Sequence, residues 1–384
     1  MIKKLLTSKR DYSGIISSLL AVVIGLTFGF IVLLAVKPSA AVKGFQLLLT
    51  GGFFNGWKTF GSVFFYATPL ILSGLACAFA FKASIFNIGG PGQMHIGALA
   101  TIWVTLNCGL GAPWAPILGL CAGAVAGALW SLIPALLNAF KRVNIIITTI
   151  MMNYIGMYLA VDLLKKSNVF DSTKNQSMTI PRELRVSRLG LDELTIGGTQ
   201  PFKGSSIDCG FLIAVVIAIV LWYILEKTTF GYEIKAVGKN RDASDYAGIN
   251  AKRTIVVSVL ISGALMGLGG GFMYMGWAGK YLIGSNTQLS EGFTGIAVTM
   301  LAGNNPLGCI LSGFFIAYLT QSGSFMQSVG YAPEIVKVIT SVVVYCSALS
   351  ALVSEYIRKK KLDLMVEEGR NIKDGTTNEK GGNK

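Results

Sequence analysis

The feature that most constrains this chain is a series of apolar blocks, each close to the length that crosses a membrane. A helix needs roughly 20 predominantly apolar residues to span the hydrocarbon core of a bilayer. Such blocks recur from residue 14 to residue 354 and leave no room for a soluble core. Charged residues make up only 14% of the chain, whereas a soluble domain carries about a quarter. The sequence therefore predicts an all-α, polytopic membrane helix bundle.

The apolar blocks predict about ten transmembrane helices. The first block follows a basic start, but at about 23 residues it is longer than the apolar region of a signal peptide, so we expect a permanent span. An even number of crossings places both termini on the same side of the membrane. The expected spans are 14–36, 61–81, 85–108, 113–139, 143–164, 209–225, 254–277, 290–303, 306–327 and 334–354.

Lysine and arginine residues cluster just outside these blocks. With ten crossings, the clusters all fall on one side, which the positive-inside rule assigns to the cytoplasm. The net charge of +14 then reflects topology, and no basic face with interleaved aromatic residues predicts a nucleic-acid partner. The expected divisions are a cytoplasmic N-terminus (1–13), a transmembrane domain (14–354) with an extracytoplasmic loop (165–208) and a cytoplasmic loop (226–253), and a charged cytoplasmic tail (355–384).

The composition argues against several chemistries. The six cysteines show no C-x-x-C spacing, and His95 is the only histidine. This leaves little from which to build a zinc site or a nucleophile with its base. No G-x-x-x-x-G-K-[ST] motif is present, so the chain has no Walker loop for ATP. We expect neither an enzyme nor a metal or cofactor bound to this chain.

Two predicted spans contain residues that interrupt helices. Residues 87–92 read Asn-Ile-Gly-Gly-Pro-Gly, and residues 303–306 read Gly-Asn-Asn-Pro. Backbone groups freed inside a membrane need protein or water partners, and paired interruptions point to a pathway near the midplane. Polar residues within the membrane are pathway candidates, although here they could equally serve only to hydrogen-bond the broken backbone. The candidates are Asn87, Gln93, His95, Asn304 and Asn305.

The cytoplasmic loop predicts a short helix. Asn240 can cap it, Asp242 supplies negative charge to its first turn, and Gly248 can end it. One side of this helix would suit docking into a groove of a soluble partner, because it carries Ala243, Tyr246 and Ala247. The alternative is an ordinary solvated connector.

Glycine residues recur at the spacing of close helix packing. Gly123 and Gly127 form one pair, and Gly263, Gly267 and Gly271 form a second series. Small residues four apart let membrane helices approach closely. We expect these glycines to pack within the bundle or against a second subunit.

Three ordered motifs resemble the permease family of ABC importers for branched-chain amino acids, ribose-type sugars and nucleosides. Residues 86–97 are similar to F-N-I-G-x-E-G-Q-x-x-x-G, residues 236–250 to A-V-G-x-N-x-x-A-A-x-Y-A-G-I-N, and residues 295–308 to G-I-A-V-A-L-L-G-x-N-x-P-x-G. The nucleoside, or simple-sugar, branch is the most similar, and the likeness runs from about residue 69 to residue 350. The chain departs from the family at Pro91, where Glu is usual, at Ser244, where Ala is common, and at His95, where an aliphatic residue is usual.

The resemblance implies a permease subunit that moves nucleosides by alternating access, driven by ATP hydrolysis on another polypeptide. A ribose-type sugar permease is the alternative within the family. A secondary transporter driven by ions is a further alternative, but it predicts ionisable residues within the spans. Only Lys82, Asp162 and Lys337 approach the predicted spans, all near their ends.

The family also implies the partners and the residues that meet them. The partners would be an ABC ATPase subunit, a second, shorter permease that forms a heterodimer, an extracytoplasmic substrate-binding protein or lipoprotein, the nucleoside or sugar, and the lipid of a bacterial inner membrane. The pathway would form between the two permeases. The loop that docks on the ATPase would use Glu233, Ala236, Gly238, Asn240, Asp245, Tyr246, Ala247, Gly248 and Ile249.

Overall fold

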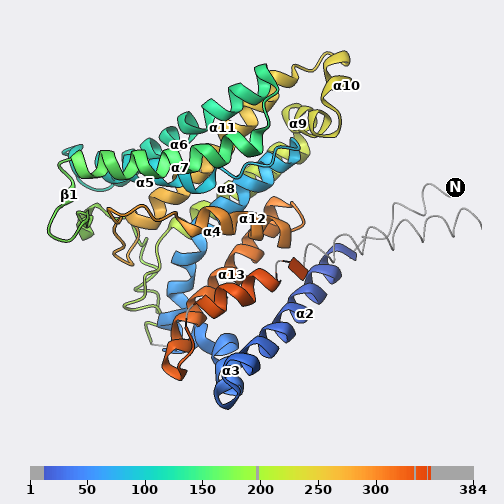
Figure 1. The fold of residues 1–384 in the computed structure, drawn as a ribbon. Helices are drawn as coiled ribbons and strands as arrows, with labels where there is room; N and C mark the ends of the chain where they lie inside the picture. The colour runs from blue at the N-terminus through green and yellow to red at the C-terminus, as the bar shows by residue number, and fades with distance from the viewer. Residues whose placement is uncertain (1–12, 196–198, 333, 344, 347–384) are drawn as a thin grey trace, which may run out of the picture.

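The computed structural model describes residues 13–195, 199–332, 334–343 and 345–346, and the predicted tail (355–384) lies outside them. The described chain is mostly helical, which confirms the predicted all-α membrane fold (Figure 1). The α-helices are α2 (Ser13–Val36), α3 (Ala41–Thr50), α4 (Trp57–Lys82), α5 (Gly90–Asn107), α6 (Trp114–Lys141), α7 (Ile145–Lys166), α8 (Gly210–Lys227), α9 (Thr229–Lys239), α10 (Arg241–Tyr246), α11 (Ala251–Met275), α12 (Ser290–Leu301) and α13 (Pro306–Met326).

Short elements complete the described chain. A two-stranded antiparallel hairpin pairs β1 (Phe170–Asp171) with β2 (Gln176–Ser177). Residues 334–343 form a further helical stretch. The 3₁₀ helices are η1 (Pro38–Ala40), η2 (Gly51–Phe53), η3 (Arg182–Leu184) and η4 (Gln327–Val329).

Six of the described helices are long and apolar enough to cross a membrane: α4, α6, α7, α8, α11 and α13. Their bounds lie within four residues of the predicted spans, because uniformly apolar runs are easy to locate. The predicted spans 85–108 and 290–303 correspond to the shorter helices α5 and α12, and the last span, 334–354, continues beyond the described residues. The count of ten crossings therefore stays a prediction.

Helix α3 was not predicted, because residues 37–60 lie between the first two expected spans. It packs beside α2 and α13 at one corner of the molecule (Figure 1). Leu48 of α3 is fully buried there, and Gly44 lies against the ring of Tyr331. The Tyr331 hydroxyl lies 3.1 Å from the carbonyl oxygen of Leu33 and 2.8 Å from that of Lys37, and its single proton can be donated to either. This contact anchors the residues after α13 to the end of α2.

The centre of the bundle is built on glycines of α5, α6 and α11. A Cβ atom on Gly267 would lie 2.2 Å from the carbonyl oxygen of Gly123, and one on Gly127 would lie 2.4 Å from that of Gly263. A Cβ on Gly97 would lie 2.4 Å from the Cα of Gly267. Distances this short admit only glycine, so the predicted packing role of these residues is confirmed within a single chain.

The two ends of the bundle differ in structure. Helices α9 and α10 lie at one end, and the β-hairpin lies at the opposite end (Figure 1). The end with α9 and α10 also carries Lys141 and Arg142 at the end of α6, and Lys227 at the end of α8. These residues lie close to the membrane-capable helices, where the positive-inside rule counts charge. The opposite end also carries basic residues, among them Arg182, Arg185 and Arg188. The assignment of the end with α9 and α10 to the cytoplasm stays a prediction.

Candidate functional site

The two short helices α5 and α12 meet at their N-terminal ends inside the bundle. Residues 85–89 are not helical, and α5 begins at Gly90. Helix α12 has 12 residues, so it is roughly 18 Å long and covers little more than half of a membrane core. A Cβ on Gly292 of α12 would lie 2.5 Å from the nitrogen of Pro91 in α5. The N-terminal ends of both short helices, which carry partial positive charge, therefore lie against each other.

Asn87 and Gln93 form a buried hydrogen-bond network beside this junction. The Asn87 amide donates to Ser262 Oγ of α11 at 3.1 Å and to Gln93 Oε1 at 3.3 Å. Asn87 Oδ1 accepts the Gly89 N–H at 2.9 Å. Both side chains are 1% exposed. Their polar groups thus bond to one another and to the broken backbone, and a role in the substrate pathway stays a prediction.

His95 connects α5 to the loop between α11 and α12. Its Nδ1 lies 2.9 Å from the carbonyl oxygen of Pro91, and its Nε2 lies 3.1 Å from that of Thr287. A neutral imidazole can donate to only one of these oxygens. His95 also lines a cavity of about 380 Å³ with residues of the loop, including Lys280 and Tyr281.

Asn304 and Asn305 lie apart from these residues, at the turn between α12 and α13. Asn304 adopts a positive φ of 58°, and its Oδ1 is buried without a hydrogen-bond partner among the described residues. Asn305 Oδ1 caps α13 by accepting the Leu307 N–H at 3.0 Å. The length of α12, roughly 18 Å, separates this turn from the Gly292 junction. The structure therefore does not bring the five predicted pathway residues into one site.

A pair of charged residues, Glu291 and Lys280, was not predicted from the sequence. Glu291 lies in the first turn of α12, within the predicted span 290–303, yet it was not counted among the ionisable residues of the spans. Its partner, Lys280, comes from the loop that follows α11, and their charged atoms are 3.8 Å apart. Tyr66 of α4 lies beneath the Lys280 ammonium, 4.9 Å from ring centroid to Nζ. An acidic residue directly before the Gly-Phe-Thr-Gly motif is the signal that could have revealed the group.

The predicted short helix of the cytoplasmic loop is confirmed as α10. Asn240 Oδ1 accepts the Ala243 N–H at 3.0 Å, and Gly248 has a positive φ of 82°, which ends the helix. The sequence analysis did not predict α9, which precedes it. The other residues predicted to dock on the ATPase lie on α9, on α10 or just after α10. Ala243, Asp245, Tyr246 and Ala247 are exposed, and Glu233, Ala236, Gly238 and Ile249 are half-buried.

Direct contacts attach α9 and α10 to the ends of membrane helices. Ser84, just after α4, donates a hydrogen bond from its Oγ to the carbonyl oxygen of Gly238 at 2.5 Å. Arg241 donates to the carbonyl oxygen of Ala139 in α6 at 2.6 Å. Displacement of α9 and α10 would therefore be passed to α4 and α6.

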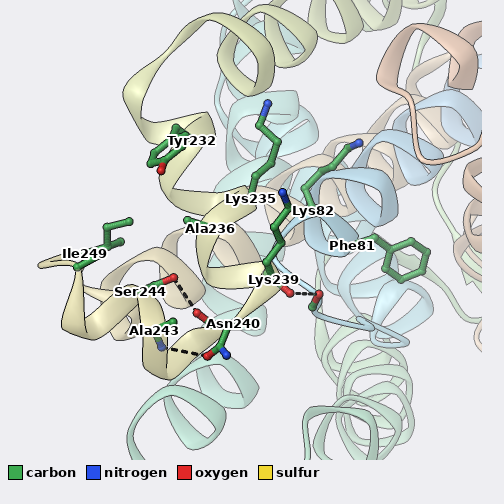
Figure 2. Close-up of a pocket in the computed structure, with 13 residues that line it drawn as sticks. Phe81, Lys82, Tyr232, Lys235, Ala236, Lys239, Asn240, Ala243, Ser244 and Ile249 are labelled. Carbon is green, nitrogen blue, oxygen red and sulfur yellow. Dashed lines mark hydrogen bonds between the residues drawn. The ribbon is translucent and has the colours of Figure 1, made fainter. Parts of the chain in front are cut away.

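A groove of about 700 Å³ lies between these attachments. Figure 2 shows Lys82, Lys235 and Lys239 on the side of the groove near α4, and Tyr232 and Ile249 on the other side. Lys235 pairs with Glu226 at 3.2 Å. The groove is thus lined by both basic and apolar side chains, and it lies at the same end of the molecule as the exposed Tyr246.

The opposite end holds a buried carboxyl group beside an arginine cluster. The Arg188 guanidinium lies 3.8 Å from the ring centroid of Trp277 and pairs with Asp192 at 2.6 Å. Asp208 is 2% exposed, and its Oδ1 accepts the Gly210 N–H at 2.9 Å. Burial raises the pKa of Asp208 to about 7, against smaller lowering effects of the Gly210 hydrogen bond and the Arg188 charge.

The described residues contain no group of three or more His, Cys, Asp or Glu residues that could hold a metal ion. The polar groups of this chain are thus not arranged as a metal centre in the part of the chain that the structure covers.

Residues 59–348 match the family described as the permease component of the branched-chain amino acid transport system. The chain belongs to this family, as its motifs predicted. It is a membrane-spanning transport subunit, and ATP hydrolysis in such systems resides on separate subunits.

Several curated proteins are similar along most of the chain. The nucleoside ABC transporter permease NupB of Lactococcus lactis is 33% identical over 355 residues, which cover 89% of this chain and 93% of that protein. The guanosine ABC transporter permease NupP of Bacillus subtilis is 33% identical over 358 residues, covering 92% and 98%. The glucose ABC transporter permease TsgB13 of Haloferax volcanii is 31% identical, covering 79% of each chain. No solved structure is significantly similar to this chain.

Proposed function

We propose that this chain is the membrane-spanning permease of an ATP-driven importer of nucleosides. The observation that carries the proposal is the similarity to relatives named for nucleoside and guanosine transport, which extends over about nine-tenths of the chain at 33% identity. The residues matched by the family, 59–348, include the short helices α5 and α12 and the helices α9 and α10. The substrate class is carried over from those relatives.

The α9–α10 surface is proposed as the contact with the ATPase subunit. It is exposed, its small helix is fixed by the Asn240 cap, and its contacts through Ser84 and Arg241 lead to α4 and α6. Closure of two ATPase subunits would move α9 and α10 and thereby shift the bundle between inward-open and outward-open states. ATP is then used by the partner and is not held by this chain.

The remaining partners and the orientation belong to the same proposal. A second, shorter permease would pair with this chain in a heterodimer, and a substrate-binding lipoprotein would deliver nucleoside at the end with the β-hairpin. The basic residues around α9 and α10 support a cytoplasmic location of that end, with both termini on the same side of a bacterial inner membrane.

Uptake in cells with and without this gene tests the proposal. Labelled guanosine, uridine and ribose would be compared before and after ATP depletion. Loss of ATP-dependent nucleoside uptake alone is the expected result. A fall in ribose uptake with unchanged nucleoside uptake would replace the substrate class. Uptake that persists without ATP but collapses with an ionophore would overturn the ATP-driven mechanism.

A substitution at Gly248 tests the docking surface separately. Its positive φ disfavours any side chain, and a β-branched residue most of all. Gly248→Val should therefore abolish uptake while the protein remains in the membrane. Gly111→Ala is the matched control, because a Cβ there meets no atom within 4 Å and the φ is not positive. Normal uptake by Gly248→Val would count against the docking role of α10.

A further inference from the structure

A cavity of about 420 Å³ lies between α4, α12, α13 and the helical stretch 334–343. Its volume falls within the range of about 300–1,000 Å³ that is typical of small-molecule sites. Four elements that are distant in sequence contribute to it, so it is a property of the folded bundle. Its walls combine two aromatic rings, hydroxyl groups and opposite charges, among them Tyr66, Lys280, Glu291, Phe293 and Thr294.

Three charged side chains line this cavity: Lys280, Glu291 and the exposed Lys337. Lys280 and Glu291 do not satisfy each other. The Lys280 Nζ lies 3.8 Å from Glu291 Oε1, beyond the roughly 2.7–2.9 Å of a charge-assisted hydrogen bond. No described residue hydrogen-bonds the Lys280 ammonium. The only described hydrogen bond to the Glu291 carboxylate comes from Ser290 Oγ at 3.3 Å. The side chains are 29% and 23% exposed, so both groups keep hydrogen-bonding capacity toward the cavity.

This arrangement suits an uncharged molecule with a pair of adjacent hydroxyl groups. A carboxylate has two oxygens that accept hydrogen bonds, and a vicinal diol offers two donors at matching spacing. Carboxylates hold the ribose hydroxyls of dinucleotides in the same way. The Lys280 ammonium can donate to an ether or hydroxyl oxygen beside the diol.

The aromatic rings at the cavity suit the other half of a nucleoside. Tyr66 and Phe293 both line the cavity, and the Phe293 side chain is 39% exposed. Any nucleobase can stack on an aromatic face, so this contact tolerates different bases. Recognition would then depend on the ribose hydroxyls more than on the base.

We propose that this cavity is a ribonucleoside-binding subsite, in which the Glu291 carboxylate accepts hydrogen bonds from the 2′- and 3′-hydroxyls and Lys280 orients the sugar. The proposal rests on the proposed function, because it names where the transported nucleoside is held. It also explains why Glu291 stands at the start of an interrupted helix, beside the Gly292–Pro91 junction. A substrate bound there would contact the N-terminal end of α12.

Competition for uptake tests the subsite in cells that hold the complete transporter. The probe is labelled guanosine or uridine, and the competitors are the unlabelled ribonucleoside, its 2′,3′-dideoxy analogue and its 5′-monophosphate. The wild type should prefer the ribonucleoside over the dideoxy analogue at least tenfold. Glu291→Gln should raise the KM for the ribonucleoside about tenfold and reduce this preference to less than threefold. Asp162→Asn, which removes an exposed carboxylate paired with Lys166, should leave both values unchanged.

The outcomes separate this inference from the function on which it rests. If deletion of the gene leaves nucleoside uptake unchanged, the proposed function fails and the subsite fails with it. If uptake depends on the gene but the dideoxy analogue competes as well as the ribonucleoside, only the subsite is overturned. The wild-type preference decides this even if Glu291→Gln fails to fold. Stronger competition by the monophosphate would also overturn the proposal, because it would indicate an anion site.

Discussion

At the scale of single residues, the attachment of α9 depends on one close approach between backbones. A Cβ on Gly238 would lie 2.3 Å from the carbonyl oxygen of Lys82, and this oxygen cannot move without shifting the end of α4. We expect Gly238→Ala to reduce uptake at least tenfold, while the amount of protein in the membrane changes less than twofold. Uptake assays combined with quantitative immunoblotting would measure both. Unchanged uptake would show that the α4–α9 contact is not needed for coupling.

A second prediction at this scale concerns the pH dependence of stability. Because burial raises the pKa of Asp208 to about 7 from an ordinary 3.8, the folded state keeps a proton that the unfolded chain has lost. The group therefore lowers stability progressively as the pH rises from about 4 to about 7, and the full penalty persists above that. Asp208→Asn removes the charge and can still accept the Gly210 N–H.

The Asp208→Asn variant should accordingly raise the melting temperature of the purified transporter by several degrees at pH 8, and much less at pH 4.5. Thermal unfolding at both pH values would measure the difference. Asp162→Asn serves as the comparison, because Asp162 is exposed. An equal gain at both pH values would contradict the assignment of a buried, proton-binding carboxyl group.

At the scale of elements, α10 has only six residues and depends on its cap. Loss of an N-cap side chain costs about 1 kcal/mol, which is large for a helix too short to be stable alone. Asn240→Ala should therefore lower uptake several-fold with normal protein levels. Asn144→Ala removes the equivalent cap of α7, where Asn144 accepts the Ile146 N–H, and should have little effect on uptake. Equal losses in both variants would indicate a general effect on stability.

Helix ends and breaks can be predicted from the sequence where the residues that cause them act on their neighbours in the chain. The α10 cap and stop were predicted because Asn240 and Gly248 act on residues next to them. The break before α5 was predicted because Gly and Pro act locally in the same way. Helix α3 was missed because it is short and carries Lys43 and Gln46 among its apolar residues, so it resembles a connector.

At the scale of the whole molecule, the limits of prediction come from contacts between distant segments. Six apolar helices could be located because each carries its own signal. The cavity at Glu291 could not, because it exists only where α4, α12 and a loop residue, Lys280, come together. Likewise, the sequence left open whether Asn87 and Gln93 line a pathway or bond to the broken backbone, and the partner of Asn87, Ser262, comes from the distant helix α11. Burial of a polar residue can be inferred from sequence, but its partner depends on the packing of the bundle.

The proposed coupling mechanism depends on the orientation of the whole molecule in the membrane. A cytoplasmic ATPase can meet α9 and α10 only if that end of the bundle lies inside the cell. Tyr246 is 95% exposed at this end, and Met178 is 48% exposed beside the β-hairpin at the other. Each residue would be replaced by cysteine and treated with a membrane-impermeant thiol reagent, with the unsubstituted chain measuring background labelling from its own cysteines.

Met178→Cys should react in intact cells, whereas Tyr246→Cys should react only after the membrane is permeabilised. The basic residues at the ends of α6 and α8 are the physical reason, since positively charged segments are retained on the cytoplasmic side. The opposite pattern would place α9 and α10 outside the cell. The contacts through Ser84 and Arg241 would then still join the two helices to α4 and α6, but they could not transmit the closure of a cytoplasmic ATPase.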